Sequence, residues 1–491
     1  GWASADITPD QPVLILGQFH ARVSEGVADP LSATAMALES TGPDGEPVRS
    51  VIVSCDVAAI SDDLCNAVRQ RVPDVAAELD PMHVVMNATH THTGPQVRVT
   101  QVEGCVPNAC GLTPEELGIM PPEDYVAFAA DRIADAIARA WNNREPAGIG
   151  FGLGHATVGY NRRICYYTGE TIMYGGVHHP EFSHLEGTTD TSVNILCTWN
   201  RDEQLTGVVV NIACPSQVSE QDFQISADYW HETRLALRQR LGEDVFILPQ
   251  CSAAGDVVPA KSRRTVPDWK ALERMWERQG RTHRQDIAES IADAVTPVVE
   301  GVGREIDWQP TVTHRVETVP LTRRLIDKKD VDEALAEADQ WEEKYEALRQ
   351  ELDANPQKRN EPRWYVDISK ASRRIGWHRG VAERYELQQR EPKIETEVHV
   401  LRLGEVAFAT NRFEYYLDFG LQIKARSPAT QTFVVQLAGP GTYLPTQRAA
   451  SGKSYGAVPA STLVGPEGGR ELADWTVAAL EQMWQAQPVA T

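Results

Sequence analysis

Two histidines separated by a single residue are the feature of the sequence that most directly suggests chemistry. His90 and His92 lie in the segment NATHTHTGP, where they alternate with threonines. In an extended segment both imidazoles point to the same side, and two imidazoles at that spacing can share a zinc ion. The alternative is a pair of histidines in a surface loop, because histidine is commonly a partly exposed residue. The Gly-Pro pair that follows favours a fixed loop.

A carboxylate and a phenol occur in comparable positions near the C-terminal end. Glu414, in NRFEYY, follows an apolar run, where a carboxylate is costly to bury unless it is paired or binds a metal. The alternative is a surface ion pair with Arg412. Tyr443, in GPGTYLPT, follows turn-forming residues that place its phenol where a strand ends. A tyrosine that packs with only its polar tip exposed is the alternative there.

Three further polar segments are candidates for the same site. Asp256, in SAAGDVVP, follows small residues that allow a ligand to approach the backbone, although a simple turn explains the segment equally well. Asp56 directly follows an apolar run, and we expect it to contact the substrate. Arg163, beside Arg162 in GYNRR, can bind a substrate carboxylate through two hydrogen bonds, with surface charge pairing as the alternative.

The elements that must position these residues are short β-branched runs alternating with helical patterns. The runs cover residues 51–55, 83–87, 208–212, 245–248, 406–409 and 432–437, and nearly every polar cluster above directly follows one of them. This alternation predicts an α/β fold with a mixed sheet and helices on its faces. Open α/β sheets bind ligands at the ends of their strands, so the clusters are expected to form one site.

Three helices stand out from the apolar spacing. One follows Pro121 and Pro122, a second begins near Ser226 and ends at Gly242, and a highly charged third spans about 327–356. No internal repeat and no linker rich in Gly, Ser or Pro is found. We therefore expect a single domain over 1–491, with residues 327–392 forming a helical excursion or lid.

Composition excludes several classes of function. The chain has 491 residues, of which 42% are hydrophobic, and a formal net charge of -22, which disfavours binding to nucleic acid and to anionic lipid. No run of about eighteen apolar residues predicts a membrane span. The sequence also lacks the phosphate-binding loop, the dinucleotide fingerprint and the H-E-x-x-H pair, so nucleotide cofactors are not expected.

The eight cysteines and the start of the chain bear on compartment. Only Cys105 and Cys110, in GCVPNACG, are placed for a local disulfide. The opening GWASADITPD has neither an initiator Met nor an apolar signal region, which is expected of a mature or trimmed chain. Secreted, periplasmic and cytoplasmic locations all remain compatible with it.

The ordered series of motifs resembles the neutral/alkaline, non-lysosomal ceramidases, which are zinc amidohydrolases. The resemblance covers most of the chain and rests on GWASADITP, SCDVAAIS, NATHTHTGP, SADYWHETR, CSAAGDVVP, NRFEYY, GTYLPT and KSYG. It implies the α/β catalytic domain of that family. Because the chain stops after the helix predicted over 472–484, the immunoglobulin-like C-terminal domain of many ceramidases is not expected.

The resemblance also implies roles for particular residues. His90, Glu414 and Tyr443 correspond to zinc ligands of the family, and His92 and Tyr455 to residues that assist the substrate oxyanion. The second zinc histidine of the family should fall in NIACPSQVSE, which contains none. Cys214 can supply a thiolate there, or His231 can reach over from the following helix, and zinc accepts either donor. We prefer His231, because the carboxylate of Asp228 can orient its ring.

A second departure from the family concerns the position after Gly255 and Asp256. The family's GD-x-SP motif has a serine that attacks or steers the amide, and this chain has Val258 in its place. Water activated by the metal is therefore the expected nucleophile, with His92 or Asp256 transferring protons.

The sequence thus predicts a zinc-dependent hydrolase that acts on an amide or related bond of a small molecule derived from a glycan or lipid. Its twelve tryptophans favour a polar, sugar-containing substrate. One alternative is a carbohydrate-active enzyme, a glycosidase or lyase, on the same fold, in which Cys214 is a metal-assisted nucleophile. The other is a binding protein without catalytic activity, since fold alone does not determine function.

Overall fold

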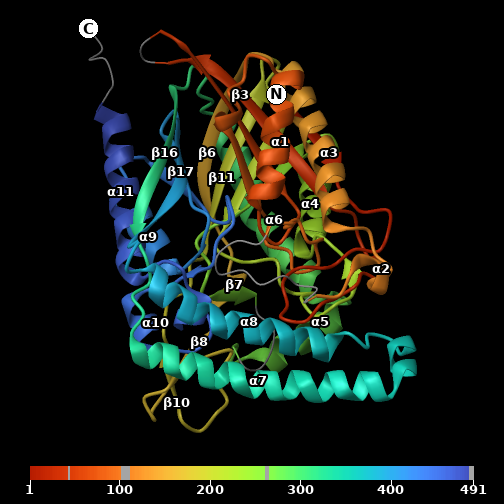
Figure 1. Cartoon of the computed structure of the whole chain (residues 1–491). Helices are drawn as coiled ribbons and strands as arrows, with labels where there is room; N and C mark the ends of the chain where they lie inside the picture. The colour runs from red at the N-terminus through yellow and green to blue at the C-terminus, as the bar shows by residue number, and fades with distance from the viewer. Residues whose placement is uncertain (43–44, 101–110, 260–264, 486–491) are drawn as a thin grey trace.

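Three four-stranded sheets surround one apolar core in the computed structural model of the chain, which describes residues 1–42, 45–100, 111–259 and 265–485 (Figure 1). The predicted pair Cys105 and Cys110 lies outside the described residues. The mixed α/β class with helices on the sheet faces is confirmed, whereas the single sheet that we expected is three separate ones.

The three sheets have the same strand order. The first contains β1 (Trp2–Asp6), β3 (Ser32–Thr41), β4 (Pro47–Cys55) and β5 (Val84–Ala88). The second contains β6 (Ala147–His155), β11 (Ser192–Asn200), β12 (Leu205–Ile212) and β14 (Phe246–Cys251). The third contains β16 (Val312–Thr322), β17 (Lys393–Leu403), β18 (Val406–Thr410) and β20 (Gln431–Val435).

The same topology is therefore built three times along the chain. In each sheet the first three strands pair antiparallel in chain order, and the fourth pairs parallel to the third. A parallel pair requires a crossover, which is a helix in every case: α1 (Asp62–Val75), α4 (Tyr229–Leu241) and α9 (Leu417–Arg426). A second helix follows the fourth strand: α3 (Pro122–Asn142), α6 (His283–Val302) and α11 (Pro466–Gln485). This repeat of topology has no counterpart in the sequence pattern.

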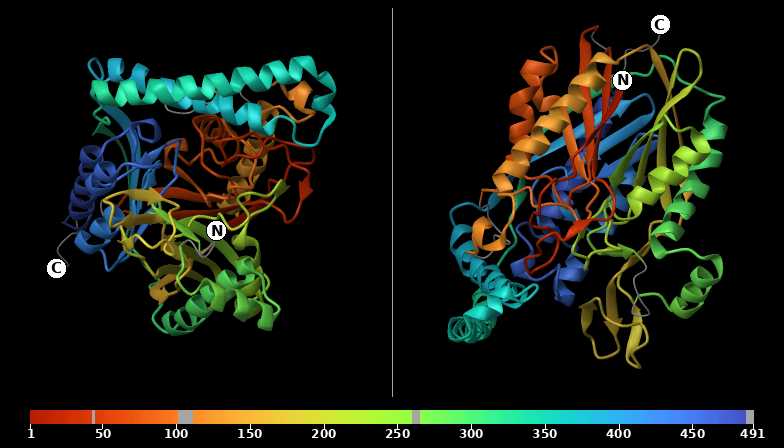
Figure 2. Two further views of the ribbon diagram at one scale, coloured as in Figure 1. Left: turned by 90° about the horizontal axis from the view of Figure 1, so that it is seen from below. Right: turned by 90° about the vertical axis from the view of Figure 1, so that its right-hand side faces the viewer.

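Each sheet has two apolar faces with different partners. The inner faces meet in one shared core, to which the sheets contribute, for example, Met36, Leu248 and Phe408. The outer faces are covered by α1 with α3, by α4 with α6, and by α9 with α11 (Figures 1 and 2). All three parallel pairs begin at one end of this arrangement and finish at the other, so the residues that follow them gather at one end.

The predicted helices are found close to their expected bounds. The helix after Pro121 is α3, and the charged helix is α7 (Lys328–Ala354), capped by Asp327. The helix expected from Ser226 starts three residues later, because the cap is Asp228, whose carboxylate accepts from the Tyr229 amide. No helix in the described parts of the chain is long and apolar enough to span a membrane.

A helical hairpin leaves the third sheet between β16 and β17. It consists of α7, a short 3-10 turn (Pro356–Asn360) and α8 (Val366–Leu387). The two helices run side by side across one end of the molecule, with α8 nearer the sheets (Figures 1 and 2). A cluster that includes Val331, Val381 and Ala460 seals α7 and α8 against the C-terminal part of the chain.

The remaining elements are short and lie in the connections. They are β2 (Gly26–Val27), β7 (Gly159–Asn161), β8 (Arg163–Tyr166), β9 (Thr171–Met173), β10 (Phe182–Leu185), β13 (Gln224–Ile225), β15 (Val257–Pro259), β19 (Glu414–Tyr415), β21 (Tyr443–Leu444), α2 (Pro114–Leu117), α5 (Trp269–Gln279), α10 (Gln447–Gly452) and the 3-10 turns Pro81–His83 and Pro459–Ser461.

A chain of two histidines, of which His399 is buried and His314 half-buried, joins the first sheet to the third. Nδ1 of His314 lies 2.8 Å from the Ser50 hydroxyl, and its Nε2 lies 3.1 Å from Nδ1 of His399. Nε2 of His399 lies 2.9 Å from Glu397, which also pairs with Arg69. Burial lowers the pKa of His314 well below its usual range and also lowers that of His399, although Glu397 opposes the shift at His399. Both rings are therefore neutral at pH 7.

This chain of histidines predicts that the folded state loses stability in acid. An unfolded chain binds protons at both histidines below about pH 6.5, whereas burial resists their protonation in the folded chain, so folding stability should fall by up to about 1.4 kcal/mol per histidine for each pH unit between that value and the lowered pKa of each ring. We expect His314→Gln to be less stable than wild type at pH 7 but to lose less stability between pH 7 and pH 5. Urea unfolding at the two pH values measures this, and equal losses in both proteins would contradict it.

Candidate functional site

The Glu414 and Tyr443 side chains are brought together by two strand extensions. Beyond β18 and β20 the chain forms β19 and β21, a two-residue parallel ladder in which Glu414 and Tyr443 are register partners. Gly255 allows this ladder to sit against the end of β14, because a Cβ atom there would lie 2.3 Å from the Glu414 carbonyl oxygen. The Gly255 amide donates instead to the Tyr415 carbonyl at 2.8 Å.

The His90 and His92 loop follows β5 and is not the extended segment that we expected. His90 has a positive φ of 65°, which turns the chain immediately after the strand. The hydroxyls of Thr91 and Thr93 both donate to the Ser226 carbonyl, at 2.7 and 2.9 Å. The threonines are therefore anchored on one side of the loop, and the two imidazoles converge on the other.

The two imidazoles face each other through their Nε2 atoms, which lie 3.3 Å apart. Nδ1 of His90 lies 2.5 Å from the Ala58 carbonyl, which can only accept, so Nδ1 carries a proton. Nε2 of His92 lies 2.7 Å from the Gln217 amide nitrogen, and its Nδ1 lies 3.6 Å from the Glu220 carboxylate. Both rings thus turn Nε2 toward the other.

The carboxylate of Glu414 completes this group. Its Oε2 lies 3.6 Å from Nε2 of His90 and 3.8 Å from the guanidinium of Arg162. The Arg162 side chain is 1% exposed and donates to the Gly255 carbonyl at 2.8 Å, to the Tyr443 hydroxyl at 3.2 Å and to the Tyr174 hydroxyl. A single buried cation therefore orients both the carboxylate and the phenol.

Two adjoining cavities give access to these groups. One, of about 160 Å³, is lined by His90, Glu414 and Trp377, and the other, of about 570 Å³, by Tyr174, Glu220 and Val258. They share the walls formed by Gly17, Gln18, Phe19, His92, Tyr443 and Tyr455. One continuous hollow is therefore lined by the five residues predicted from the sequence motifs: His90, His92, Glu414, Tyr443 and Tyr455.

Aromatic rings form the wall of the hollow beneath the helical hairpin. The ring centroid of Tyr455 lies 5.4 Å from that of Tyr443, 5.8 Å from Phe19 and 6.1 Å from Trp377, which belongs to α8. Burial raises the pKa of Tyr455, so its hydroxyl is a proton donor at pH 7. Gly17, with φ of 114°, passes so close to His92 that a Cβ atom would lie 2.5 Å from the imidazole.

The donor set fits a zinc ion in its chemistry. Ligands of a tetrahedral zinc with bonds of 2.0–2.1 Å lie about 3.4 Å apart. The 3.6 Å separation between His90 Nε2 and the Glu414 carboxylate is close to that value. Among the described residues, no group of three or more His, Cys, Asp and Glu side chains surrounds one point. The Tyr443 phenol, to which Arg162 donates, lines the same cavity as His90 and Glu414.

The two residues considered for the missing histidine ligand lie elsewhere. Cys214 is fully buried in the core under the second sheet, with Sγ 3.5 Å from the Val158 carbonyl. His231 is half-buried on α4 and lines neither cavity. The Asp228 carboxylate, expected to orient His231, caps α4 and accepts from the Ser219 amide at 2.6 Å. Within the segment 211–220 it is Gln217 that reaches the imidazole pair.

Asp256 and Arg163 lie behind the site and not on its walls. Asp256 accepts from the Leu417 amide and the Asn161 side chain, both at 2.8 Å, and burial raises its pKa. It therefore holds the first turn of α9. Arg163 forms two hydrogen bonds to Glu186, at 2.6 and 3.0 Å, with both side chains at most 3% exposed. This buried pair takes the place of the substrate contact that we expected.

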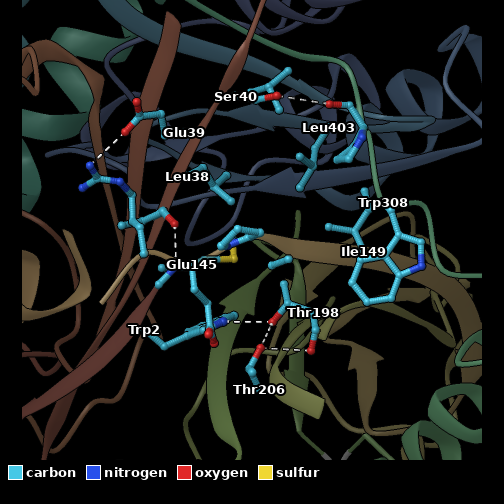
Figure 3. A pocket seen from close by; sticks show the side chains of 18 of the residues that line it. Trp2, Leu38, Glu39, Ser40, Glu145, Ile149, Thr198, Thr206, Trp308 and Leu403 are labelled. Carbon is cyan, nitrogen blue, oxygen red and sulfur yellow. Dashed lines mark hydrogen bonds and ion pairs between the residues drawn. The ribbon is translucent and has the colours of Figure 1, made fainter. Parts of the chain in front are cut away.

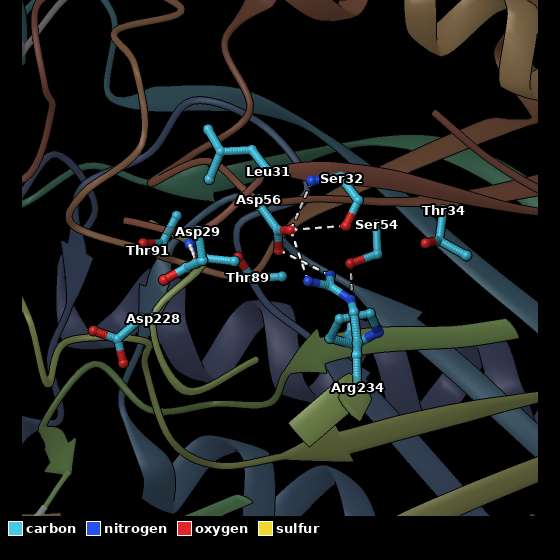
Figure 4. A network of polar contacts seen from close by, with 12 residues as sticks. Asp29, Leu31, Ser32, Thr34, Ser54, Asp56, Thr89, Thr91, Asp228 and Arg234 are labelled. Carbon is cyan, nitrogen blue, oxygen red and sulfur yellow. Dashed lines mark hydrogen bonds and ion pairs between the residues drawn. The ribbon is translucent and has the colours of Figure 1, made fainter. Parts of the chain in front are cut away.

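Asp56 likewise has partners within the protein (Figure 4). Its carboxylate pairs with both terminal nitrogens of Arg234, at 2.8 and 3.0 Å, and accepts from the Ser32 amide at 2.9 Å. Asp56 is fully buried and Arg234 nearly so. The pair joins the end of β4 to α4 in the neighbouring repeat, which is a structural contact and not a substrate contact.

A larger hollow of about 900 Å³ lies where the parallel pairs begin, at the opposite end from the histidines (Figure 3). Its polar side chains bond to one another. Trp2 donates to the Thr198 hydroxyl at 2.9 Å, Thr198 lies 2.7 Å from Thr206, and Glu39 pairs with Arg144 at 2.8 Å. It contains none of the residues that the sequence singled out for chemistry.

Sequence patterns did not identify three residues that the geometry brings to the site. Gln217 and Glu220 contact His92, and Trp377 supplies an aromatic wall from the helical hairpin. Gln217 and Glu220 lie in the segment 211–220, where the family resemblance placed a histidine ligand. Their position in that segment is the feature of the sequence that could have indicated them. The Trp377 position depends on how α8 folds back, which its own spacing does not reveal.

Comparison with known proteins identifies the fold. No protein-family model and no curated protein sequence matches the chain. The neutral ceramidase from Pseudomonas aeruginosa superposes with a TM-score of 0.67 at 15% identity, over 100% of this chain and 75% of that one. A ceramidase complexed with C2 superposes with the same TM-score at 14% identity, covering 100% and 76%. The fold implied by the sequence resemblance is therefore confirmed.

The buried pair of Asp56 and Arg234 makes a stability prediction. Asp56→Ala should lower the free energy of unfolding by about 3–5 kcal/mol, because it leaves the Arg234 cation buried without a counter-charge. The control is Asp293→Ala, which removes an exposed carboxylate from Arg240 and should cost at most about 1 kcal/mol. Chemical denaturation measures both, and equal small losses would contradict the structural role of Asp56.

Proposed function

We propose that the protein is a zinc-dependent hydrolase that cleaves an amide or related bond, with His90, Glu414 and Tyr443 as the metal ligands. The observation that carries this proposal is the 3.3 Å approach of the Nε2 atoms of His90 and His92 beside the Glu414 carboxylate on a cavity wall. The two solved structures with this fold are named ceramidases, which supports a hydrolase in particular.

The protein side of this site is held in place before any ligand arrives. The Ala58 carbonyl fixes the tautomer of His90, and Arg162 fixes Glu414 and Tyr443. Burial raises the pKa of the Tyr443 phenol, whereas the adjacent Arg162 lowers it. A bound zinc ion supplies Lewis-acid polarisation of a carbonyl and lowers the pKa of water toward neutrality.

His92 is the residue placed to move a proton. Its Nε2 faces the hollow and can accept a proton from an attacking water, while Glu220, 3.6 Å from Nδ1, stabilises the imidazolium that results. Gln217 holds the ring through the same nitrogen, so His92 acts as a base only when this hydrogen bond is exchanged for one to water. The imidazolium of His92 then donates this proton to the leaving amine.

Tyr455 is placed to stabilise the developing oxyanion. Tyr455 lines both cavities, and its ring packs between Tyr443 and Trp377. Val258 lies on the wall of the larger cavity, where a hydroxyl nucleophile was considered, and it offers only apolar surface. An attacking water is therefore the nucleophile that this wall supports.

Metal content is the first test of this proposal. Purified wild type should contain about one zinc per chain by elemental mass spectrometry, and His90→Ala should contain almost none, because a catalytic zinc needs three protein ligands. His231→Ala serves as the matched control and should keep its zinc. A folded wild type that contains no zinc, and whose thermal unfolding midpoint does not change when zinc is added, would contradict the zinc proposal. Loss of zinc in His231→Ala would instead identify His231 as a ligand.

Tyr455→Phe tests the oxyanion contact. On the best substrate of an N-acyl amide panel, kcat should fall by about 10²–10³ with little change in KM, because the hydroxyl acts only as charge develops on the oxygen. The phenylalanine ring keeps the aromatic packing. A rise in KM at constant kcat would instead make Tyr455 a ground-state binding residue.

A further inference from the structure

The helical hairpin presents arginines to the hollow, and one of them forms no ion pair. Arg374, on α8, lines the larger cavity together with His92, Tyr174 and Tyr455. Its guanidinium lies 3.6 Å from the ring centroid of Phe19 and 4.9 Å from that of Trp377. Across the part of the chain that the structure describes, it forms neither a hydrogen bond nor an ion pair, and its Nε is buried without a partner.

The carboxylates of the site are already engaged and do not neutralise this cation. Glu414 faces His90 and Arg162, and Glu220 faces His92. Burial lowers the pKa of Arg374, and the opposing contributions of Tyr455 and Glu337 do not offset it. Glu337 attracts this cation but forms no ion pair with it, and a half-buried cation without an ion pair is unfavourable, so the cavity has room for an anion at this point.

Stacking on Phe19 leaves the nitrogen edge of the guanidinium free for two parallel hydrogen bonds. That planar edge matches a carboxylate, and an aromatic face beneath the cation holds it in one orientation. The adjoining smaller cavity receives Arg373 from the next position of α8 and Arg98 from the histidine loop, which makes this side of the hollow electropositive. The opposite side holds the candidate metal ligands.

We propose that the substrate is an amide that bears a carboxylate, which Arg374 binds while the amide lies against His90, Glu414 and Tyr443. The proposal rests on the proposed function for the position of the amide, and it adds the substrate class. An N-acylated amino acid has this chemistry, with a carboxylate close to its amide bond. The helical hairpin is then a specificity element, since it supplies both Arg374 and Trp377.

Equilibrium binding tests the proposal with two probes that differ only in charge. N-octanoylglycine and N-octanoylglycinamide are titrated by calorimetry into wild type, Arg374→Gln, Arg374→Lys and Arg379→Gln. Arg379 is the matched control, because it lies on the same helix but pairs with Glu342 at the surface. Thermal unfolding of each variant checks that it is folded.

Wild type should bind the carboxylate probe at least about tenfold more tightly than the amide probe, as expected for a charge-assisted hydrogen-bonded pair. The preference should disappear in Arg374→Gln, be reduced in Arg374→Lys, and persist in Arg379→Gln. Equal affinities for the two probes in wild type, no binding of either at millimolar concentration, or a preference that survives in Arg374→Gln would overturn the proposal. Tighter binding of octyl phosphate that depends on Arg374 would overturn the carboxylate in favour of a phosphate monoester.

Chromatographic analysis of the probes after titration reports cleavage separately. Cleavage without a preference for the carboxylate would leave the hydrolase standing and remove the substrate class. A carboxylate preference that depends on Arg374, found without cleavage under zinc saturation, would keep the substrate class and count against the hydrolase.

Discussion

The buried guanidinium of Arg162 is the contact on which the candidate site depends. It joins the Gly255 carbonyl beyond β14 to the Tyr443 phenol on β21, and it lies 3.8 Å from Glu414. Burying a cation costs several kcal/mol unless polar groups stay in contact with it. Moving any one of these three groups away from Arg162 is therefore unfavourable, and all three are held in place. Groups that are fixed in this way need little reorganisation when charge develops on a substrate.

This contact is possible because three copies of one topology end at the same place. Each copy finishes its parallel strand pair at the same end of the molecule, and the residues that follow the pairs differ in type: imidazoles after β5, small residues after β14, and a carboxylate and a phenol beyond β18 and β20. The scaffold therefore repeats while the chemistry does not. The core shared by the three inner faces makes this convergence rigid.

The sequence allowed much of this arrangement to be predicted, for identifiable reasons. Strand ends are visible as apolar runs followed by polar residues, so His90, Glu414 and Tyr443 were grouped correctly on one cavity. Asp56 and Arg163 follow the same kind of pattern but form the buried pairs with Arg234 and Glu186. Pairing between distant segments decides such cases, and a single sequence does not contain it. The same limitation concealed the threefold topology, because apolar spacing specifies an element and not its neighbours.

The chain leaves the third sheet for the helical hairpin and returns to it at a single point. Thr322 and Lys393, the residues on either side of it, are register partners at the end of the pairing between β16 and β17. A two-residue turn could join those strands with the register unchanged. The segment is therefore modular: evolution, or an engineer, could lengthen, shorten or exchange it without repacking the three sheets. Relatives that share this scaffold can thus diverge in what they accept while they conserve how they act on it.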